Sequence, residues 1–92
     1  MLDLVKLSLW ITTDAYDSVI TMLINDCVAE MTSLGVIGAD ADSEDPQIQS
    51  AVVSYVGWKS GFAEREDEYR DIYHTKLSQL KTTSGYTDWG VE

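Results

Sequence analysis

The chain has 92 residues, of which 45% are apolar, and a net charge of −10 that comes from 16 acidic and 6 basic residues. This size fits one domain with one core. The acidity excludes direct binding to nucleic acid or to an anionic membrane, because both need a surface of Lys and Arg. Cys27 is the only cysteine, so no internal disulfide forms. We also find no signal-peptide pattern and no membrane-spanning run, and expect an intracellular product.

Apolar periodicity predicts an all-α fold, a small bundle of about four helices. The first covers residues 2 to about 10 and is so short that it must dock onto the others. The second lies within residues 11–35, where Thr13 or Asp14 is expected to cap its start and Gly35 to end it. Its inner face is predicted from apolar residues at three- and four-residue steps: Val19, Ile20, Leu23, Ile24, Cys27, Val28, Met31 and Leu34.

A polar, acidic loop over residues 36–45 precedes the third predicted helix. Asp45 and Pro46 form an N-cap followed by a proline at the first helical position, and Gly61 is expected to end this helix. We interpret Gly57 as a weak point of this helix close to a turn. The alternative is that the missing side chain lets two subunits pack closely. The fourth helix runs from 63 or 64 to about 82, with an inner face predicted at Tyr69, Ile72, Tyr73, Lys76, Leu77 and Leu80.

The acidic loop does not fit a calcium-binding loop. With Asp40 as the first ligand, Asp42 and Glu44 take the third and fifth positions. However, the sixth position, which should be glycine, is Asp45, and the twelfth, which should be glutamate, is Ala51. We therefore interpret the loop as solvated and predict no metal site and no cofactor.

No arrangement of side chains predicts catalysis. His74 is the only histidine and has no cysteine at ligand spacing, and Cys27 lies in an apolar stripe where packing explains it. The acidic residues of the predicted first helical turns complement the helix dipole. Because no nucleophile or phosphate-loop motif is present either, we predict that the protein is not an enzyme.

The aromatic residues favour a role in protein binding. Trp58, Phe62, Tyr86 and Trp89 are hard to bury together in four short helices, and Trp and Tyr are frequent anchors of interfaces. Trp89 could instead fold back and complete the core. The position of Tyr86 and Trp89 beyond the last helix favours docking on a partner.

Four segments, in their order and spacing, resemble the head–tail connector family of tailed phages. They are LVKLSLWI, DSVITMLINDCVAEM, DPQIQSAVVSYVGWKSG and EYRDIYHTKLSQLKTTSGY, and the likeness spans residues 2 to about 86. The resemblance implies a structural virion protein without catalysis. It divides the chain into a helical connector domain, residues 1–85, and a C-terminal docking tail, residues 86–92.

The resemblance also implies partners. Copies of the chain would form a ring under the portal protein, with the twelvefold symmetry expected from the portal. The ring would extend the DNA channel and carry the stopper or tail-completion protein. It would lie at the head–tail junction of the virion, after assembly in the host cytoplasm and without a membrane. Tyr86 and Trp89 would dock on the portal.

Charge assigns further roles within such a ring. Acidic side chains that face the lumen would repel DNA phosphates and let DNA pass without specific binding. The candidate channel-facing acids are Asp40, Asp42, Glu44, Glu64, Glu66 and Glu68. Ring contacts join two different faces of each subunit. The candidate subunit-interface residues are Trp58, Lys59, Phe62, Arg65, Tyr69 and Arg70.

One function from another class also fits the charge. A small acidic protein can mimic DNA and inhibit a host nucleic-acid-binding protein. Such a mimic would spread its carboxylates over one face, whereas here they gather in one loop and one helix start. The clustering favours the connector.

Overall fold

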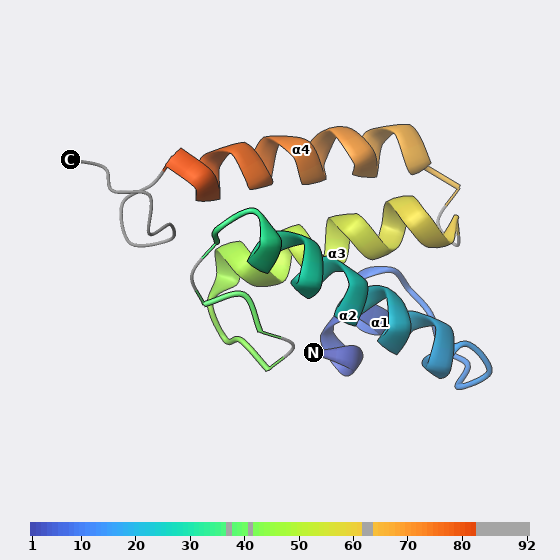
Figure 1. Cartoon of the computed structure of the whole chain (residues 1–92). Helices are drawn as coiled ribbons and strands as arrows, with labels where there is room; N and C mark the ends of the chain where they lie inside the picture. Colours follow the sequence, from blue (N-terminus) through green and yellow to red (C-terminus); the bar gives the residue numbers. More distant parts are fainter. Residues whose placement is uncertain (37, 41, 62–63, 83–92) are drawn as a thin grey trace.

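In a computed structural model of the chain, four helices form a small all-α bundle (Figure 1). The structure describes residues 1–36, 38–40, 42–61 and 64–82. The helices are α1 (Leu2–Ser8), α2 (Asp17–Ser33), α3 (Pro46–Ser60) and α4 (Glu66–Thr82). The described residues contain no strand, so the predicted fold class is confirmed.

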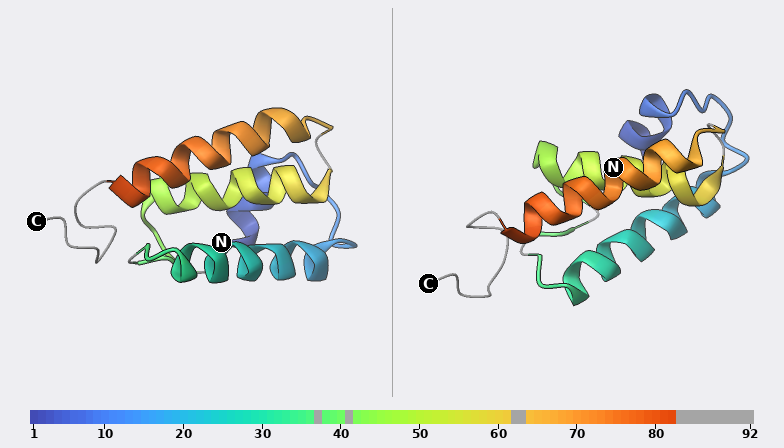
Figure 2. Two further views of the ribbon diagram at one scale, coloured as in Figure 1. Left: turned by 45° about the horizontal axis from the view of Figure 1, so that its top comes forward. Right: turned by 90° about the horizontal axis from the view of Figure 1, so that it is seen from above.

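Helix α3 is the centre of the bundle, and α1, α2 and α4 pack around it (Figure 2). Its sequence is apolar on several sides, as expected of a helix with neighbours in several directions. Successive long helices alternate in direction, so α3 and α4 form an antiparallel hairpin (Figure 1). The buried apolar core comprises Val5, Leu9, Ile20, Ile24, Cys27, Met31, Val36, Ile48, Ala51, Val52, Tyr55, Val56, Tyr73, Leu77 and Leu80.

The helix signals around α3 were predicted correctly. The Asp45 side chain accepts a hydrogen bond of 2.8 Å from the backbone N–H of Gln47, and Pro46 takes the first helical position. Gly61 ends α3 in the left-handed conformation, with φ of 71°. Gly35 adopts φ of 88° just after α2. All three predictions concern contacts within one turn of the chain.

The other helix boundaries differ from the prediction. Helix α2 starts at Asp17, and its N-cap, Tyr16, makes no side-chain capping bond. The residues expected to cap it have other partners: Thr13 accepts from the N–H of Ala15, and Asp14 binds Lys6. Helix α4 starts at Glu66 instead of 63 or 64. Glu64 has φ of 55°, which an α-helix cannot contain.

Two inner-face predictions were wrong. Val19 is 42% exposed and Ile72 is 43% exposed, although both fit the periodicity of their helices. Helix α1 ends at Ser8, and Trp10 lies beyond it with 87% of its surface exposed and φ of 60°. Apolar residues at these positions therefore contribute to the surface of the subunit.

Candidate interaction surfaces

The acidic loop places three predicted channel residues at the start of α3. Asp40, Asp42 and Glu44 are all exposed, and the backbone N–H of Asp42 donates to Asp40 Oδ1 at 2.8 Å. This hydrogen bond holds the Asp40 carboxylate in a short local turn. In the part of the chain that the structure describes, no three His, Cys, Asp or Glu side chains gather into a potential metal site.

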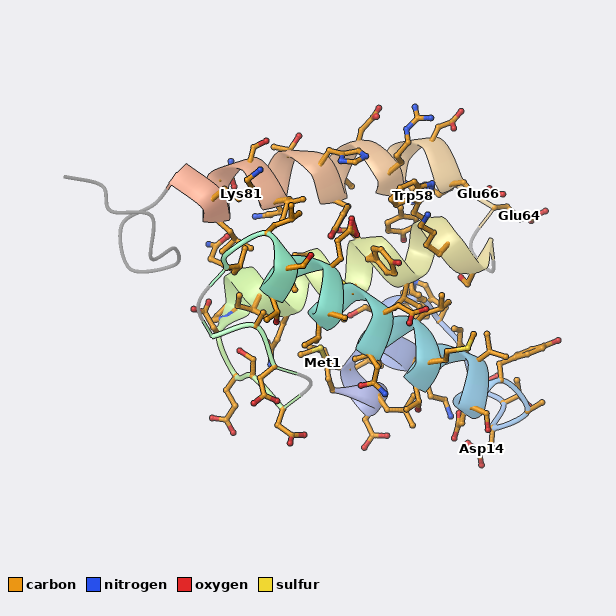
Figure 3. All side chains as sticks on the ribbon, in the orientation of Figure 1. Met1, Asp14, Trp58, Glu64, Glu66 and Lys81 are labelled. Atoms are coloured by element: carbon orange, nitrogen blue, oxygen red, sulfur yellow. The ribbon has the colours of Figure 1, made fainter. Side chains whose placement is uncertain are left out.

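The other predicted channel acids are exposed and lie where α3 ends and α4 begins. Figure 3 labels Glu64 and Glu66, and Glu68 belongs to the first turn of α4. Arg65 pairs with Glu68, its Nε lying 3.0 Å from Glu68 Oε2. A helix of 15 residues is about 22 Å long, at 1.5 Å per residue. The two groups of acids are thus separate surfaces.

Trp58, a predicted interface residue, contacts several rings of its own chain. It is half-buried, with centroid distances of 6.0 Å to Tyr55, 6.0 Å to Tyr73 and 5.4 Å to His74. The ammonium of Lys59 lies 4.0 Å from its ring centroid (Figure 3 labels Trp58). This arrangement is a cation–π contact. Trp58 therefore supports the α3–α4 packing with part of its surface and leaves the remainder accessible.

Tyr69 explains the glycine at position 57. A Cβ atom added to Gly57 would lie 2.8 Å from the Cγ and Cδ2 atoms of the Tyr69 ring. The absence of a side chain lets α4 approach α3 closely within one chain. The close packing that the glycine permits is thus internal, whereas the sequence left packing between subunits open.

The remaining predicted interface residues differ in what surrounds them. Arg70 lies 3.6 Å from Asp67 and 3.5 Å from Asp71, and all three side chains are exposed. Such pairs at the surface hold little energy and can exchange partners. The structure pairs Lys59 with Trp58 at the end of α3 and Arg65 with Tyr69 at the start of α4. Among the described residues, the ion pairs of Arg70 are with the acids of α4 alone. Phe62, Tyr86 and Trp89 lie outside the described residues.

The buried ionisable groups serve packing. Burial raises the pKa of the Cys27 thiol to about 12, so the thiol stays protonated. Tyr73 is fully buried and donates a hydrogen bond of 3.1 Å to Glu30 Oε2, which links α4 to α2. Burial also raises the pKa of the Tyr73 hydroxyl. His74 is exposed on the surface of α4.

A groove that the sequence did not reveal runs between α1, α3 and α4. It has a volume of about 300 Å³. Its lining residues are Leu4, Ser8, Pro46, Gln49, Ser50, Val53, Ser54, Ile72 and Lys76. Lys76 is the only charged residue among them, and its ammonium lies 3.4 Å from Gln47 Oε1. Because three helices contribute, no single segment shows the groove.

A second apolar surface lies on the outer side of α2. Val19 is 42% exposed and Met22 is 54% exposed, and both fall on one side of the helix together with Asp26. The buried residues of α2, Ile20, Ile24, Cys27 and Met31, are spaced by four, three and four positions. On a helical wheel, these four residues form one narrow face of α2, and Val19 and Met22 lie outside that face. In the sequence alone, Val19 fits the same periodicity as the buried residues, so periodicity did not separate the outer stripe from the inner face.

The sequence profile of the phage connector protein family matches residues 1–87. The match covers nearly the whole chain. The chain belongs to this family. Connector proteins are structural components of phage particles, and this chain is therefore a phage connector and a component of the virion. No curated protein and no solved structure matches the sequence significantly. None of the helices among the described residues is long and apolar enough to cross a membrane.

Proposed function

We propose that this connector assembles as a ring beneath the portal, extends the DNA channel and joins the capsid to the stopper or tail-completion protein. The observation that carries the proposal is the family match over residues 1–87. The portal's symmetry makes twelve copies the expected number. Assembly would take place in the host cytoplasm, and the ring would remain at the head–tail junction.

The charge of the chain supports this role. A net charge of −10 per subunit makes a ring that repels DNA phosphates, so DNA slides through without being held. The loop acids Asp40, Asp42 and Glu44 lie at one end of α3, and Glu64, Glu66 and Glu68 at the other. In a channel that runs along α3, they would form two acidic girdles about 22 Å apart.

The α3–α4 turn offers a second contact with a neighbouring molecule. Lys59, Arg65 and Arg70 are exposed there, and Phe62 belongs to the same segment of sequence. Acids of a neighbour could replace the weak pairs that the two arginines make with their own chain. Such pairs would set the orientation of the contact more than its affinity.

The tail, residues 86–92, would attach the ring to the portal. Tyr86 and Trp89 supply large rigid side chains with few rotors, which suits them to grooves on another protein. Among the described residues, the helical core has its own set of buried residues, which run from position 5 to position 80. We expect this core to fold independently of the tail.

Deletion of residues 85–92 tests the proposal. We expect the shortened chain to keep its helical circular dichroism spectrum but to lose attachment to purified portal rings, as seen by co-sedimentation and electron microscopy. The full-length variant with Tyr86→Ala and Trp89→Ala is a second test, and it should lose attachment too because it lacks both aromatic side chains.

Two outcomes would contradict this proposal. A shortened chain that unfolds would show that Trp89 completes the core. A full chain that ignores portal rings, stays monomeric and displaces DNA from a host protein would support the DNA mimic.

A further inference from the structure

Two carboxylates of α2 have partners among the described residues, and the third does not. Asp17 lies 2.8 Å from Lys6, and Glu30 accepts from Tyr73. Asp26 is exposed and makes no ion pair or hydrogen bond with the described residues. It follows Met22 by one helical turn on the outer stripe of α2, which begins with Val19.

Lys76 is the corresponding cation in the groove. Lys6, Arg65 and Arg70 each pair with acids, whereas Lys59, Lys76 and Lys81 have no ion pair within the described part of the chain. Of these three lysines, Lys76 is the one that lines the groove. It follows Ile72 by one helical turn on α4, and both side chains line the groove. The groove thus carries an exposed apolar residue and an unpaired cation at the same spacing as Met22 and Asp26.

The two surfaces lie on opposite sides of the subunit. Seen from above, α1 and α2 flank α3 from opposite sides (Figure 2, right). All residues that line the groove come from α1, α3 and α4, and none comes from α2. Two different complementary surfaces on opposite sides produce a head-to-tail contact, which closes into a ring when the rotation permits.

We propose that the outer stripe of α2 in one copy occupies the α1–α3–α4 groove of the next copy. Met22 packs against Ile72 and Val53 of the neighbour, and Asp26 pairs with its Lys76. The contact is a helix seated in a groove and anchored at positions i, i+3 and i+7, namely Val19, Met22 and Asp26. This inference rests on the proposed ring, since it names the surfaces that join the subunits.

Charge reversal on either side tests the pairing. Asp26→Lys places two cations together in every contact, and Lys76→Asp places two anions together. Since like charges that face each other across an interface strongly disfavour binding, we expect each variant to associate at least about tenfold more weakly. Association would be measured by sedimentation velocity on the full chain, alone and with portal rings. Circular dichroism should be unchanged, because Asp26 is exposed and Lys76 lies at a helix surface.

An equimolar mixture of the two variants gives the decisive measurement. In an alternating assembly every contact contains one cation and one anion, so the mixture should regain association that neither variant shows alone. The double variant Asp26→Lys with Lys76→Asp should also recover. Asp42→Lys is the matched control, since it makes the same charge change at an exposed site in the loop before α3, outside both α2 and the groove, and should assemble normally.

The outcomes separate this inference from the proposed function. Rings that form normally with Asp26→Lys, or a mixture that stays unassembled, would overturn the α2-in-groove contact while the ring itself stands. A wild-type chain that stays monomeric both alone and on portal rings would overturn both. If substitutions of Arg65 and Arg70 abolish assembly and those of Asp26 and Lys76 do not, the α2-in-groove contact is wrong and the subunits join at the α3–α4 turn.

Discussion

Gly57 lies within α3, directly under the ring of Tyr69. Glycine costs a helix interior about 1 kcal/mol relative to alanine, so its presence there indicates a need for space. The Cγ and Cδ atoms of the ring lie near the backbone of α4 and cannot move away independently of it. This one position therefore limits how closely α3 and α4 can pack.

Gly57→Ala should destabilise the protein despite the better helix propensity of alanine. Forcing a methyl group into filled space costs about 1 to 3 kcal/mol, and the centre of this range is above the propensity gain of about 1 kcal/mol. We expect a lower midpoint of urea unfolding, with an unchanged slope.

Tyr69→Ala provides the background that isolates the clash. Once the ring is absent, the same Gly57→Ala change should become neutral or stabilise by up to about 1 kcal/mol. If Gly57→Ala stabilises the otherwise unchanged protein, the contact between α3 and α4 is looser than the structure shows.

At the scale of elements, α1 depends on one lysine. A helix of seven residues is not stable alone, so α1 persists because it docks through Val5 and Leu9 and through Lys6. The Lys6 ammonium lies 2.7 Å from Asp14 Oδ1 and 2.8 Å from Asp17 Oδ1. It thereby joins α1 to the start of α2.

The Lys6 bridge should make stability depend on pH. The hydrogen bond that Lys6 donates to Asp14 lowers the pKa of Asp14. The hydrogen bonds that Lys6 donates to Asp14 and, next in size, to Asp17 raise the pKa of Lys6. For Asp14 the stabilisation is present above the unfolded value of about 3.9 and is lost as pH falls through the lowered folded value. For Lys6 it is present below about 10.4 and is lost as pH rises through the raised folded value.

Lys6→Met should remove this dependence. We expect the variant to unfold at lower urea than the wild type at pH 6, with the gap closing in acid as Asp14 becomes protonated. Lys81→Met makes the same charge change at an exposed site near the end of α4 and serves as the control. A gap between wild type and Lys6→Met that stays constant down to pH 2 would assign the effect to packing of the lysine stem.

The sequence predicted elements best where the deciding contacts are local. The Asp45–Pro46 start and the glycine stops act within one turn, and each was confirmed. The start of α2 was wrong because Asp14, a suitable cap by type, binds a lysine eight residues earlier. Val19 and Ile72 were wrongly predicted to be on the inner faces of their helices. Periodicity shows which side of a helix is apolar, but not how much of that side its neighbours bury. Only the neighbouring helices determine which edge of the stripe is covered.

For the whole molecule, the sequence predicted the family and the separate clusters of acids, but not the groove. The family follows from the order and spacing of segments along almost the entire chain. The groove needs Leu4, Val53 and Ile72 on three different helices, so it exists only after the bundle packs. The predicted interface at Trp58 and its neighbours is partly occupied by contacts within the chain, and its role between subunits stays a prediction.

The net charge predicts how the assembled ring responds to salt. Neighbouring subunits, each at −10, repel one another, and this repulsion reaches about 30 Å at 0.01 M salt but only about 10 Å at 0.1 M. The proposed pair of Asp26 and Lys76 is short-ranged and partly covered once formed, so salt screens it less. Association at fixed protein concentration should therefore strengthen as salt rises, as measured by sedimentation velocity.

Removing acids away from the proposed contact should reduce the salt effect. Asp40→Asn, Asp42→Asn and Glu44→Gln together lower the charge without touching α2 or the groove, since all three side chains are exposed in the loop before α3. This variant should associate more strongly than the wild type at low salt and equally at high salt. Association that instead weakens steadily with salt in both proteins would mean that attraction between opposite charges outweighs the repulsion. The ring would then be held mainly by ion pairs, and the apolar stripe of α2 would contribute little to its stability.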